Sequence, residues 1–183
     1  MKRILILLAA ACCVCVASAQ KIKENKYDKF TKAHIINTSY EKVVSDKSVL
    51  GSAGGRLMKN VWVAFKGIDG TPFLCVKWCA NEILSVAQGA ELVLIDGEGE
   101  THTFKNIKTT VSGKGEGTVG AYGSALYGLN LFYTGDFSVF EGGRVFTDIR
   151  LYTSDGYIDF TISDKKKDMF SKLYTLFDAE MKK

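Results

Sequence analysis

The sequence predicts an α+β fold in which a curved antiparallel sheet of about eight to ten strands is covered by a C-terminal amphipathic helix. Two Asp-Gly dipeptides, Asp69-Gly70 and Asp155-Gly156, each separate stretches in which apolar and polar residues alternate, a pattern typical of β-hairpins. After residue 163 the apolar residues change to helical spacing. Because the sheet and the helix each have an apolar face, we expect the two faces to pack on each other.

The first 19 residues have the pattern of a secretory signal. Lys2 and Arg3 precede an uncharged, mostly apolar run over residues 4–16, and the small residues of Ala17-Ser18-Ala19 follow it. This pattern predicts cleavage near Ala19 and a secreted or periplasmic protein. A lipoprotein anchored at Cys12 is the alternative. An Ala stands three positions before Cys12, where Leu is usual, and this favours plain cleavage.

Charge and cysteine content exclude several classes of protein. The formal net charge is +4 and two of the basic residues lie in the signal, so the rest of the chain lacks the positive field of a nucleic-acid binder. Outside the signal only Cys75 and Cys79 remain, too few for a disulfide-rich scaffold. No later apolar stretch reaches the roughly 18 residues that a transmembrane helix needs. We therefore predict a Lys-rich leader at 20–29 and a single β-rich domain with a packed core at 30–183.

The register of the first predicted hairpin follows from its two-residue turn. Residues 60–68 and 71–79 flank Asp69-Gly70, which tolerates the positive φ angles of a type I′ turn. Pairing Ile68 with Thr71 creates one apolar face, made of the pairs Phe65–Leu74, Val63–Val76 and Val61–Trp78. The opposite face is mixed and holds the pairs Lys66–Phe73, Ala64–Cys75 and Trp62–Lys77, the last of which allows a cation–π contact. We expect the apolar face to be buried.

The same reasoning applies to the second hairpin, in which residues 144–154 and 157–163 flank Asp155-Gly156. Pairing Ser154 with Tyr157 predicts the apolar pairs Leu151–Phe160 and Ile149–Ile162 on one face. The side chains expected on the other face are Arg150, Tyr152 and Asp159. Both hairpins therefore indicate an antiparallel sheet with one covered side and one more polar side.

Further strands are predicted at residues 82–87, 91–96, 100–107 and 125–134, joined by Gly-rich connections. Residues 125–134 carry apolar side chains on both faces, which is typical of a central strand. Residues 30–40 resemble an edge strand, and the lysines of the leader before them are typical of a solvated tail.

The last segment has the apolar stripe of a helix, formed by Met169, Phe170, Leu173, Leu176, Phe177 and Met181. Ser163 or Asp164 can supply the N-cap, but the lysines that follow are unfavourable there, so we expect the regular helix to begin near Lys167. Earlier, Asp136 is expected to cap a short helical turn closed by Gly142-Gly143. The C-terminal helix is the only long one predicted, and is thus the expected cover of the hairpins.

The chain resembles a group of small exported proteins of unknown function from anaerobic gut bacteria. The resemblance lies in Leu92-Val93-Leu94-Ile95-Asp96-Gly97, in Asp148-Ile149-Arg150-Leu151-Tyr152-Thr153-Ser154-Asp155-Gly156-Tyr157 and in the Asp164-Lys165-Lys166-Lys167 start of the final helix. It covers the second half of the chain. The resemblance implies an exported compartment and this architecture, and it implies no activity.

Two glycine-containing motifs suggest chemistry that their context does not favour. Gly115-Glu116-Gly117-Thr118-Val119-Gly120 matches G-x-G-x-x-G, but a strand-like pattern follows it where a dinucleotide site needs a helix, so a flexible loop is the simpler interpretation. Asp96-Gly97-Glu98-Gly99-Glu100 alternates carboxylates and glycines as a Ca²⁺ site would, yet it lacks the spacing of an EF-hand, and a solvated hairpin loop fits better. We therefore predict no cofactor and no metal ion.

The cysteines and histidines form no recognisable catalytic motif. Cys75 and Cys79 lie in one predicted strand, whose extended backbone holds their Cα atoms about 13 Å apart, beyond disulfide reach. We interpret them as small, partly buried thiols, since a disulfide would require a bend in the strand. The two histidines, His34 and His102, have no metal-ligand spacing. A hydrolase would need one of them within hydrogen-bonding reach of both a Ser or Cys and a carboxylate.

The absence of catalytic motifs leads to a functional hypothesis with two alternatives. The first hypothesis is an exported, non-enzymatic binding or envelope-associated module whose partner is a protein, a glycan or a small apolar ligand. The first alternative is a carrier of a small apolar ligand in a cavity enclosed by the sheet. Its ligand-binding residues would be Trp62, Trp78, Tyr127, Phe132 and Tyr133. The second alternative is a hydrolase whose site has no sequence signature.

Overall fold

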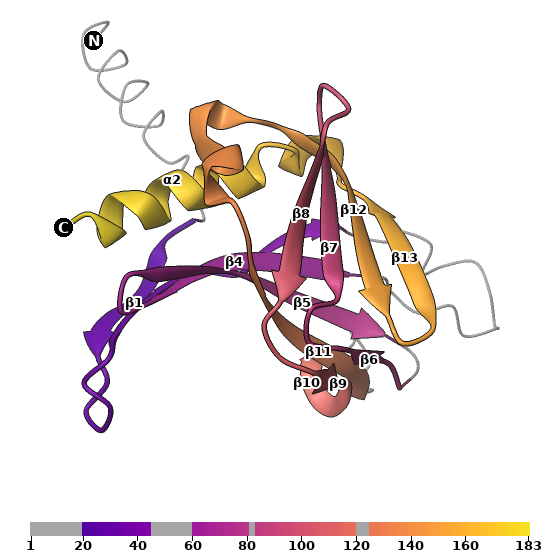
Figure 1. The fold of residues 1–183 in the computed structure, drawn as a ribbon, viewed down its shortest axis with the longest axis horizontal. Coiled ribbons are helices and arrows are strands. Elements are labelled where there is room, and N and C mark those ends of the chain that lie inside the picture. Colours follow the sequence, from indigo (N-terminus) through magenta and orange to yellow (C-terminus); the bar gives the residue numbers. More distant parts are fainter. Residues whose placement is uncertain (1–19, 45–59, 81–82, 120–124) are drawn as a thin grey trace, which may run out of the picture.

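A computed structural model describes residues 20–44, 60–80, 83–119 and 125–183 (Figure 1). Within these residues the chain forms an 11-stranded sheet, a two-stranded sheet and a C-terminal α-helix, α2 (Met169–Met181). The predicted α+β class is therefore confirmed, with somewhat more strands than expected. The predicted signal at 1–19, with cleavage near Ala19 or lipidation at Cys12, lies outside the described residues and stays a prediction.

The main sheet is open, and all of its pairings are antiparallel. Its strands are β1 (Ile22–Tyr27), β2 (His34–Thr38), β3 (Glu41–Val44), β4 (Val61–Ile68), β5 (Thr71–Ala80), β7 (Glu91–Asp96), β8 (Thr101–Asn106), β10 (Gly113–Val119), β11 (Ala125–Thr134), β12 (Phe146–Thr153) and β13 (Gly156–Thr161). Across the sheet they follow the order β1-β2-β4-β5-β11-β8-β7-β12-β13, with β3 also paired to β4 and β10 to β11. β6 (Ser85–Val86) and β9 (Thr110–Val111) form the small sheet. As predicted, β11 is a central strand.

The first hairpin, β4–β5, has the predicted turn and register. Asp69 and Gly70 adopt φ angles of +48° and +79°, as a type I′ turn requires. Ile68 pairs with Thr71, and all the predicted apolar pairs form in order and are buried. One contact on the opposite face differs, because Lys77 lies over the ring of Tyr40 rather than that of Trp62. The Trp62 ring is instead covered by a lysine of the neighbouring strand β3.

The second hairpin, β12–β13, forms with a register two residues away from the predicted one. Thr153 pairs with Gly156, so the loop is Ser154-Asp155 rather than Asp155-Gly156. This register places Arg150 opposite Asp159, and the guanidinium and carboxylate make two hydrogen bonds of 2.7 and 2.8 Å. Because a shift of two residues preserves the alternation of side chains, the predicted apolar residues of both strands still share the buried face.

The N-terminal region contains two strands that were not predicted, β1 and β3. Residues 22–27, expected to belong to a solvated leader, form β1 and pair with β2. Consequently β2 lies between β1 and β4 and is not an edge strand, and it covers only His34–Thr38 of the predicted residues 30–40. β1 has little apolar patterning, and its side chains are largely exposed. Backbone pairing rather than burial thus holds it in the sheet.

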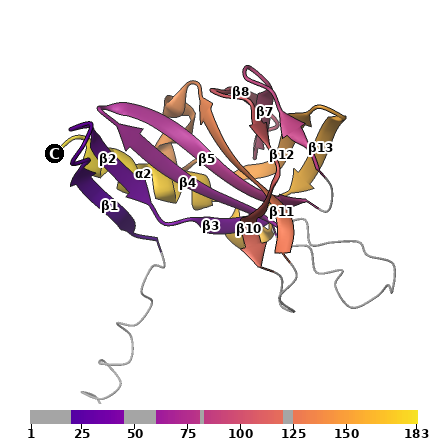
Figure 2. The same cartoon turned by 90° about the horizontal axis from the view of Figure 1, so that it is seen from below.

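Helix α2 covers one face of the sheet, as predicted. Its buried apolar side chains are Met169, Phe170, Leu173 and Phe177. α2 begins at Met169, slightly later than expected near Lys167, because the 3₁₀ turn η4 (Asp164–Lys166) precedes it. Ser163 caps η4 but makes no side-chain capping bond. Figure 2 shows α2 passing behind β2 and β4, and we call the side of these strands that is turned away from α2 the outer face.

Between β11 and β12 the 3₁₀ segment η3 (Phe137–Gly143) packs against α2 (Figure 1). As predicted, Asp136 is its N-cap, and the Asp136 carboxylate accepts a hydrogen bond of 2.9 Å from the backbone N–H of Ser138. Gly142 and Gly143 follow with φ angles of +70° and +75°, which glycine adopts without steric cost. The cap and the glycines therefore define where this short helical segment begins and where it turns away.

The Phe140 ring of η3 joins the sheet to the helix. Phe140 is fully buried, and its ring centroid lies 5.1 Å from that of Phe65 in β4 and 5.3 Å from that of Phe104 in β8. On the helix side its ring stacks on Phe170 with a centroid distance of 5.8 Å. Aromatic pairs at these separations add to the stabilisation from buried area. Phe140 thus fills the space that the bent sheet and the straight helix leave between them.

Replacement of Phe140 is expected to be strongly destabilising. Phe140→Ala removes a fully buried ring, and we expect the free energy of unfolding to fall by about 3 to 5 kcal/mol. Ile83→Ala is the matched control: Ile83 is 67 % exposed, and its truncation should change stability by no more than about 0.5 kcal/mol. Urea unfolding followed by circular dichroism measures both. Equal effects of the two substitutions would show that Phe140 does not join the layers.

Candidate functional site

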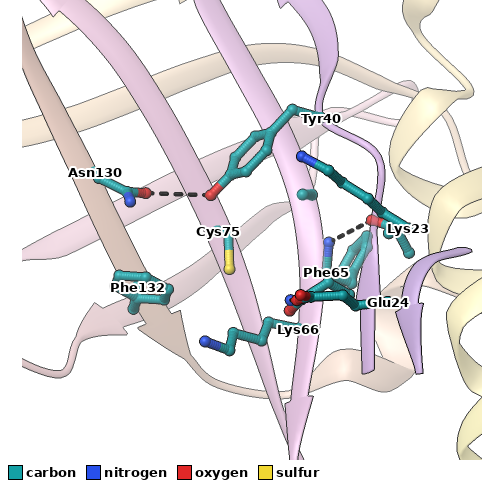
Figure 3. A pocket seen from close by; sticks show the side chains of 11 residues that line it. Lys23, Glu24, Tyr40, Phe65, Lys66, Cys75, Asn130 and Phe132 are labelled. Carbon is teal, nitrogen blue, oxygen red and sulfur yellow. Dashed lines mark hydrogen bonds between the residues drawn. The ribbon is translucent and has the colours of Figure 1, made fainter. Parts of the chain in front are cut away.

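A pocket of about 220 Å³ opens on the outer face (Figure 3). The residues that give it its chemical character are Lys23, Glu24, Asn37, Tyr40, Lys66, Cys75, Asn130 and Phe132. They come from β1, β2, the β2–β3 connection, β4, β5 and β11, which lie side by side in the sheet or join its strands. The pocket is therefore built by side chains that project from neighbouring strands on one side of the sheet.

Strand alternation explains why these side chains meet. Asn37 pairs with Lys66, and Cys75 pairs with Phe132 across the β5–β11 ladder. Their immediate neighbours in the chain, such as Phe65 and Leu74, are buried on the opposite face. Because successive side chains of a strand point to opposite faces, the packed core determines which residues reach the pocket.

Two side chains deep in the pocket are neutral under ordinary conditions. The Tyr40 hydroxyl donates a hydrogen bond of 3.1 Å to Oδ1 of Asn130 (Figure 3), and burial raises the pKa of this hydroxyl well above its usual value. Burial also raises the pKa of the Cys75 thiol to about 12. A thiol with such a pKa is protonated near neutral pH and is a poor nucleophile. The pocket therefore has polar groups suited to binding and lacks an activated thiol.

Lysines lie over the aromatic rings on and around the pocket. Lys66 and Lys108 lie over the Phe132 ring, with their Nζ atoms 5.8 and 5.1 Å from its centroid. Beside the pocket, Lys77 lies 4.4 Å from the Tyr40 ring centroid and Lys42 5.0 Å from that of Trp62. Each separation is within the range of a cation–π interaction. We call the surface formed by Tyr40, Trp62 and Phe132 with these lysines the Lys–aromatic surface.

Glu24 is the acidic side chain that lines the pocket. Its carboxylate accepts hydrogen bonds from Lys26, at 2.6 Å, and from Asn37. These bonds lower the pKa of Glu24, the one from Lys26 contributing most, so the group is ionised. Lys26 forms the ion pair with Glu24, and Lys66 interacts with the same carboxylate electrostatically, so Glu24 offsets only part of the positive charge of the Lys–aromatic surface.

The residues predicted to line a cavity do not come together. Trp62 and Phe132 lie on the outer face, in the Lys–aromatic surface. Trp78 and Tyr133 are buried in the core, where Trp78 packs edge-on against Phe160 with a centroid distance of 5.6 Å. The backbone of Tyr127 belongs to β11, but its side chain lies outside the described part of the structure. The predicted set thus divides between two faces of the sheet.

Several pocket residues were not singled out by the sequence. Tyr40 follows β2 and reaches Asn130 across the sheet, and no local pattern indicates such a contact, which joins residues 90 positions apart. The hairpin register did predict that Lys66 and Cys75 share a face, since Lys66 pairs with Phe73 and Cys75 with Ala64. The hairpin register does not predict that β11 lies beside β5, because this depends on the order of strands in the sheet.

Neither histidine has the partners that a catalytic triad needs. His34 shares a 2.7 Å hydrogen bond with Asn25 and stacks on Tyr27. His102 contacts the Asp96 carboxylate at 3.0 Å. Among the described residues, no Ser or Cys forms a hydrogen bond with either ring. The geometric condition set for a hydrolase is therefore not met in this part of the chain.

Asp96, which the sequence placed in a solvated hairpin loop, is buried. Its carboxylate accepts hydrogen bonds from His102, from Arg144 and, at 2.9 Å each, from the backbone N–H groups of Glu98 and Glu100. These bonds hold the pKa of Asp96 well below its usual value, and the bond from His102 contributes most. Because the protein's own donors occupy these oxygens, they are poorly placed to bind Ca²⁺. In the described segments no three acidic, His or Cys side chains cluster in a way that would hold a metal.

The G-x-G-x-x-G motif also lies in a different context from a dinucleotide site. Residues 113–119 form β10 and pair with β11, whereas a flexible loop was expected, and Gly120 lies outside the described residues. A dinucleotide site requires a turn from a strand into a helix at this motif. Gly115 and Gly117 of the motif therefore belong to a strand of the sheet.

Comparison with known proteins gives no indication of function. No protein-family model, no curated protein and no solved structure matches the chain. Over the residues that the structure describes, no helix has both the length and the apolar character needed to cross a membrane.

The buried Asp96 makes stability depend on pH in the acidic range. A carboxyl group whose pKa is lower in the folded than in the unfolded state contributes stability above its unfolded pKa of about 3.9, and loses it as pH falls through the folded pKa. We therefore expect Asp96→Asn to lower the melting temperature at pH 7, and this difference from the wild type should shrink below about pH 4. Melting curves between pH 7 and pH 2 test this.

Asp164→Asn is the control for that experiment. Asp164 forms an exposed ion pair of 2.9 Å with Lys167, its side chain being 92 % exposed, so its loss should change the melting temperature little at any pH. A wild-type pH dependence retained in Asp96→Asn would contradict the role given to Asp96.

The environment of Cys75 predicts slow chemical modification. Because burial raises the pKa of the Cys75 thiol, its thiolate fraction at pH 8 is far lower than that of an ordinary thiol. We expect alkylation by iodoacetamide in the native protein to be at least about tenfold slower than in urea. Mass spectrometry of the tryptic peptide 67–77, which contains Cys75 and not Cys79, measures the rate. Equal rates in the two conditions would contradict the burial of the thiol.

Proposed function

We propose that the protein is an exported, non-enzymatic binding module whose ligand occupies the outer face. One observation carries this proposal: a pocket lined by Tyr40, Lys66 and Phe132 opens on the side of the sheet that is turned away from α2. The pocket is continuous with the Lys–aromatic surface, which offers rings, cations and hydrogen-bonding groups together. Surfaces of this composition are suited to recognition, because flat rings supply contact area and a few polar groups provide specificity.

The chemical state of the pocket favours binding over catalysis. Its thiol and its phenol have raised pKa values, and neither histidine lies with a Ser or Cys in the described segments. General acid–base catalysis needs groups whose pKa lies near the working pH and that reach the substrate. A hydrolase thus has less support than a binding module.

The packing under α2 also favours the outer face over an enclosed apolar cavity. Phe170, Leu173 and Phe177 are each exposed by no more than 1 %, and they occupy the region between helix and sheet where such a cavity was hypothesised. Trp78 and Tyr133, expected to line that cavity, are part of the packed core. A carrier of a small apolar ligand is therefore the less favoured proposal.

Export is supported by the sequence of residues 1–19 alone. The basic start, the apolar run and Ala17-Ser18-Ala19 support secretion or a periplasmic location, and Cys12 supports the lipoprotein alternative. Either location would bring the outer face into contact with extracellular or envelope molecules. Protein and glycan partners are both compatible with such a location.

Ligand mapping by nuclear magnetic resonance tests the proposed site. The protein is titrated with a panel of neutral and acidic oligosaccharides, short peptides and a fatty acid, and we expect the amide shift changes to fall on strands β2, β4, β5 and β11 around the pocket. Phe132→Ala should weaken the binding found by at least about tenfold, since aromatic residues often dominate recognition energetics. Phe30→Ala, which truncates a ring that is 82 % exposed, should leave it unchanged.

Shift changes concentrated on the side chains beneath α2 would contradict the proposal and favour the carrier. A panel in which no compound perturbs the outer face would contradict it as well.

A further inference from the structure

We infer that the ligand of the outer face is a carboxylated sugar, an inference that rests on the function proposed above. It follows from three properties of the site: lysines that form no ion pair with the described carboxylates, amide and hydroxyl groups that face the pocket, and a pocket size that admits one ring. Each property restricts the chemistry of the occupant.

Within the described segments the lysines of the outer face take no part in the protein's own ion pairs. Lys23 and Lys66 line the pocket, and Lys42, Lys77 and Lys108 lie over the rings around it. Among the described residues none of these five forms an ion pair with a carboxylate, although ion pairs are present elsewhere. A site with such a surplus of ammonium groups is complementary to an anion.

This local charge contrasts with the near neutrality of the whole chain. The acidic group of the pocket, Glu24, is hydrogen-bonded to Lys26 and Asn37. It also interacts electrostatically with Lys66 without forming an ion pair, so it offsets only part of the charge of the pocket lysines. The positive charge is therefore concentrated where the pocket opens. A concentration of one sign in a cleft raises the local concentration of ligands of the opposite sign.

The polar groups beside the lysines suit a ligand that carries hydroxyl groups. Asn130 accepts the Tyr40 hydrogen bond through Oδ1, which leaves its Nδ2 hydrogens to donate to a ligand. Asn37 donates to Glu24 through Nδ2, which leaves its Oδ1 as an acceptor. The pocket thus offers both a donor and an acceptor, the combination that pairs with sugar hydroxyls, and the Phe132 ring provides a flat apolar surface for a sugar face.

The volume of the pocket limits how much of the ligand enters. At about 220 Å³ it is smaller than the roughly 300 to 1,000 Å³ typical of pockets that enclose a whole drug-sized ligand. One carboxylated ring is the matching unit, either as a free sugar or as one residue of an acidic polysaccharide whose neighbours lie over Lys77 and Trp62. A nucleic acid fits less well, because it requires a basic track along several phosphates.

The experiment compares an acidic sugar with its neutral methyl ester, which has the same sugar rings and hydroxyl groups. Binding of trigalacturonate and of its fully methyl-esterified form is measured by calorimetry and by the amide shifts of the outer face. We expect the acid to bind at least about tenfold more tightly than the ester, and its affinity to fall between 50 and 500 mM salt, since salt screens exposed charges. Galacturonic acid itself separates the two sources: equal affinity for monomer and trimer assigns a free sugar, and tighter trimer binding assigns a polymer.

Substitutions of two lysines test whether these side chains bind the carboxylate of the sugar. Lys66→Gln and, independently, Lys108→Gln should each weaken trigalacturonate binding by at least about threefold while binding of the ester stays unchanged. Lys108 is exposed in a connection between strands, so its replacement should not disturb folding. Lys172→Gln is the matched control: Lys172 is an exposed lysine of α2 paired with Asp168, and its replacement should leave binding unchanged.

Each contrary result has a separate meaning. Equal binding of acid and ester at the outer face would overturn the carboxylated sugar and leave the proposed binding surface standing. In a second case neither sugar binds, while another member of the ligand panel, or a single-stranded oligonucleotide, shifts the outer-face amides. That result would also overturn the carboxylated sugar and leave the proposed binding surface standing. Failure of the sugars together with every panel compound would overturn both the inference and the proposed function.

Discussion

The packing of the η3 rings between sheet and helix is the interaction on which the rest of the architecture depends. The sheet is bent and the helix is straight, and η3 places the buried rings of Phe137 and Phe140 between them (Figure 1). Phe140 contacts β4, β8 and α2 together, and Phe65 of β4 also stacks directly on Phe177 of α2. A well-packed core determines which residues of each strand point inward. The composition of the outer face is therefore a consequence of packing on the opposite side.

Features of this fold that depend on neighbouring residues follow from the sequence, and features that depend on contacts between distant segments do not. The β4–β5 register was predictable because Asp69 and Gly70 adopt the turn that their residue types favour, and a two-residue turn leaves one register. The β12–β13 register was not, because it departs from the turn rule by two residues and pairs Arg150 with Asp159, a cross-strand contact that a turn rule does not include. β1 escaped prediction for a related reason: it is held by backbone bonds to β2, which leave no pattern in side-chain polarity.

In the candidate site, too, local features are predictable and contacts between distant segments are not. The register that was correctly predicted already placed Trp62 and Trp78 on opposite faces, and Phe132 and Tyr133 are adjacent in one strand, so these four residues could not line one cavity. By contrast, the contact between Tyr40 and Asn130 and the burial of Asp96 by Arg144 depend on how distant segments meet. Strand order, which the sequence pattern does not specify, decided both.

The lysines near β1 have a second consequence, which concerns association between copies of the protein. Among the described residues β1 is one edge of the main sheet, so one row of its backbone N–H and C=O groups has no neighbouring strand in this part of the chain. Lys21 and Lys23 lie along this edge, together with Lys26, which is paired with Glu24. An approaching edge of the same kind would bring the ammonium groups of Lys21 and Lys23 close to those of the second copy. These like charges disfavour the addition of further copies to the sheet as strands.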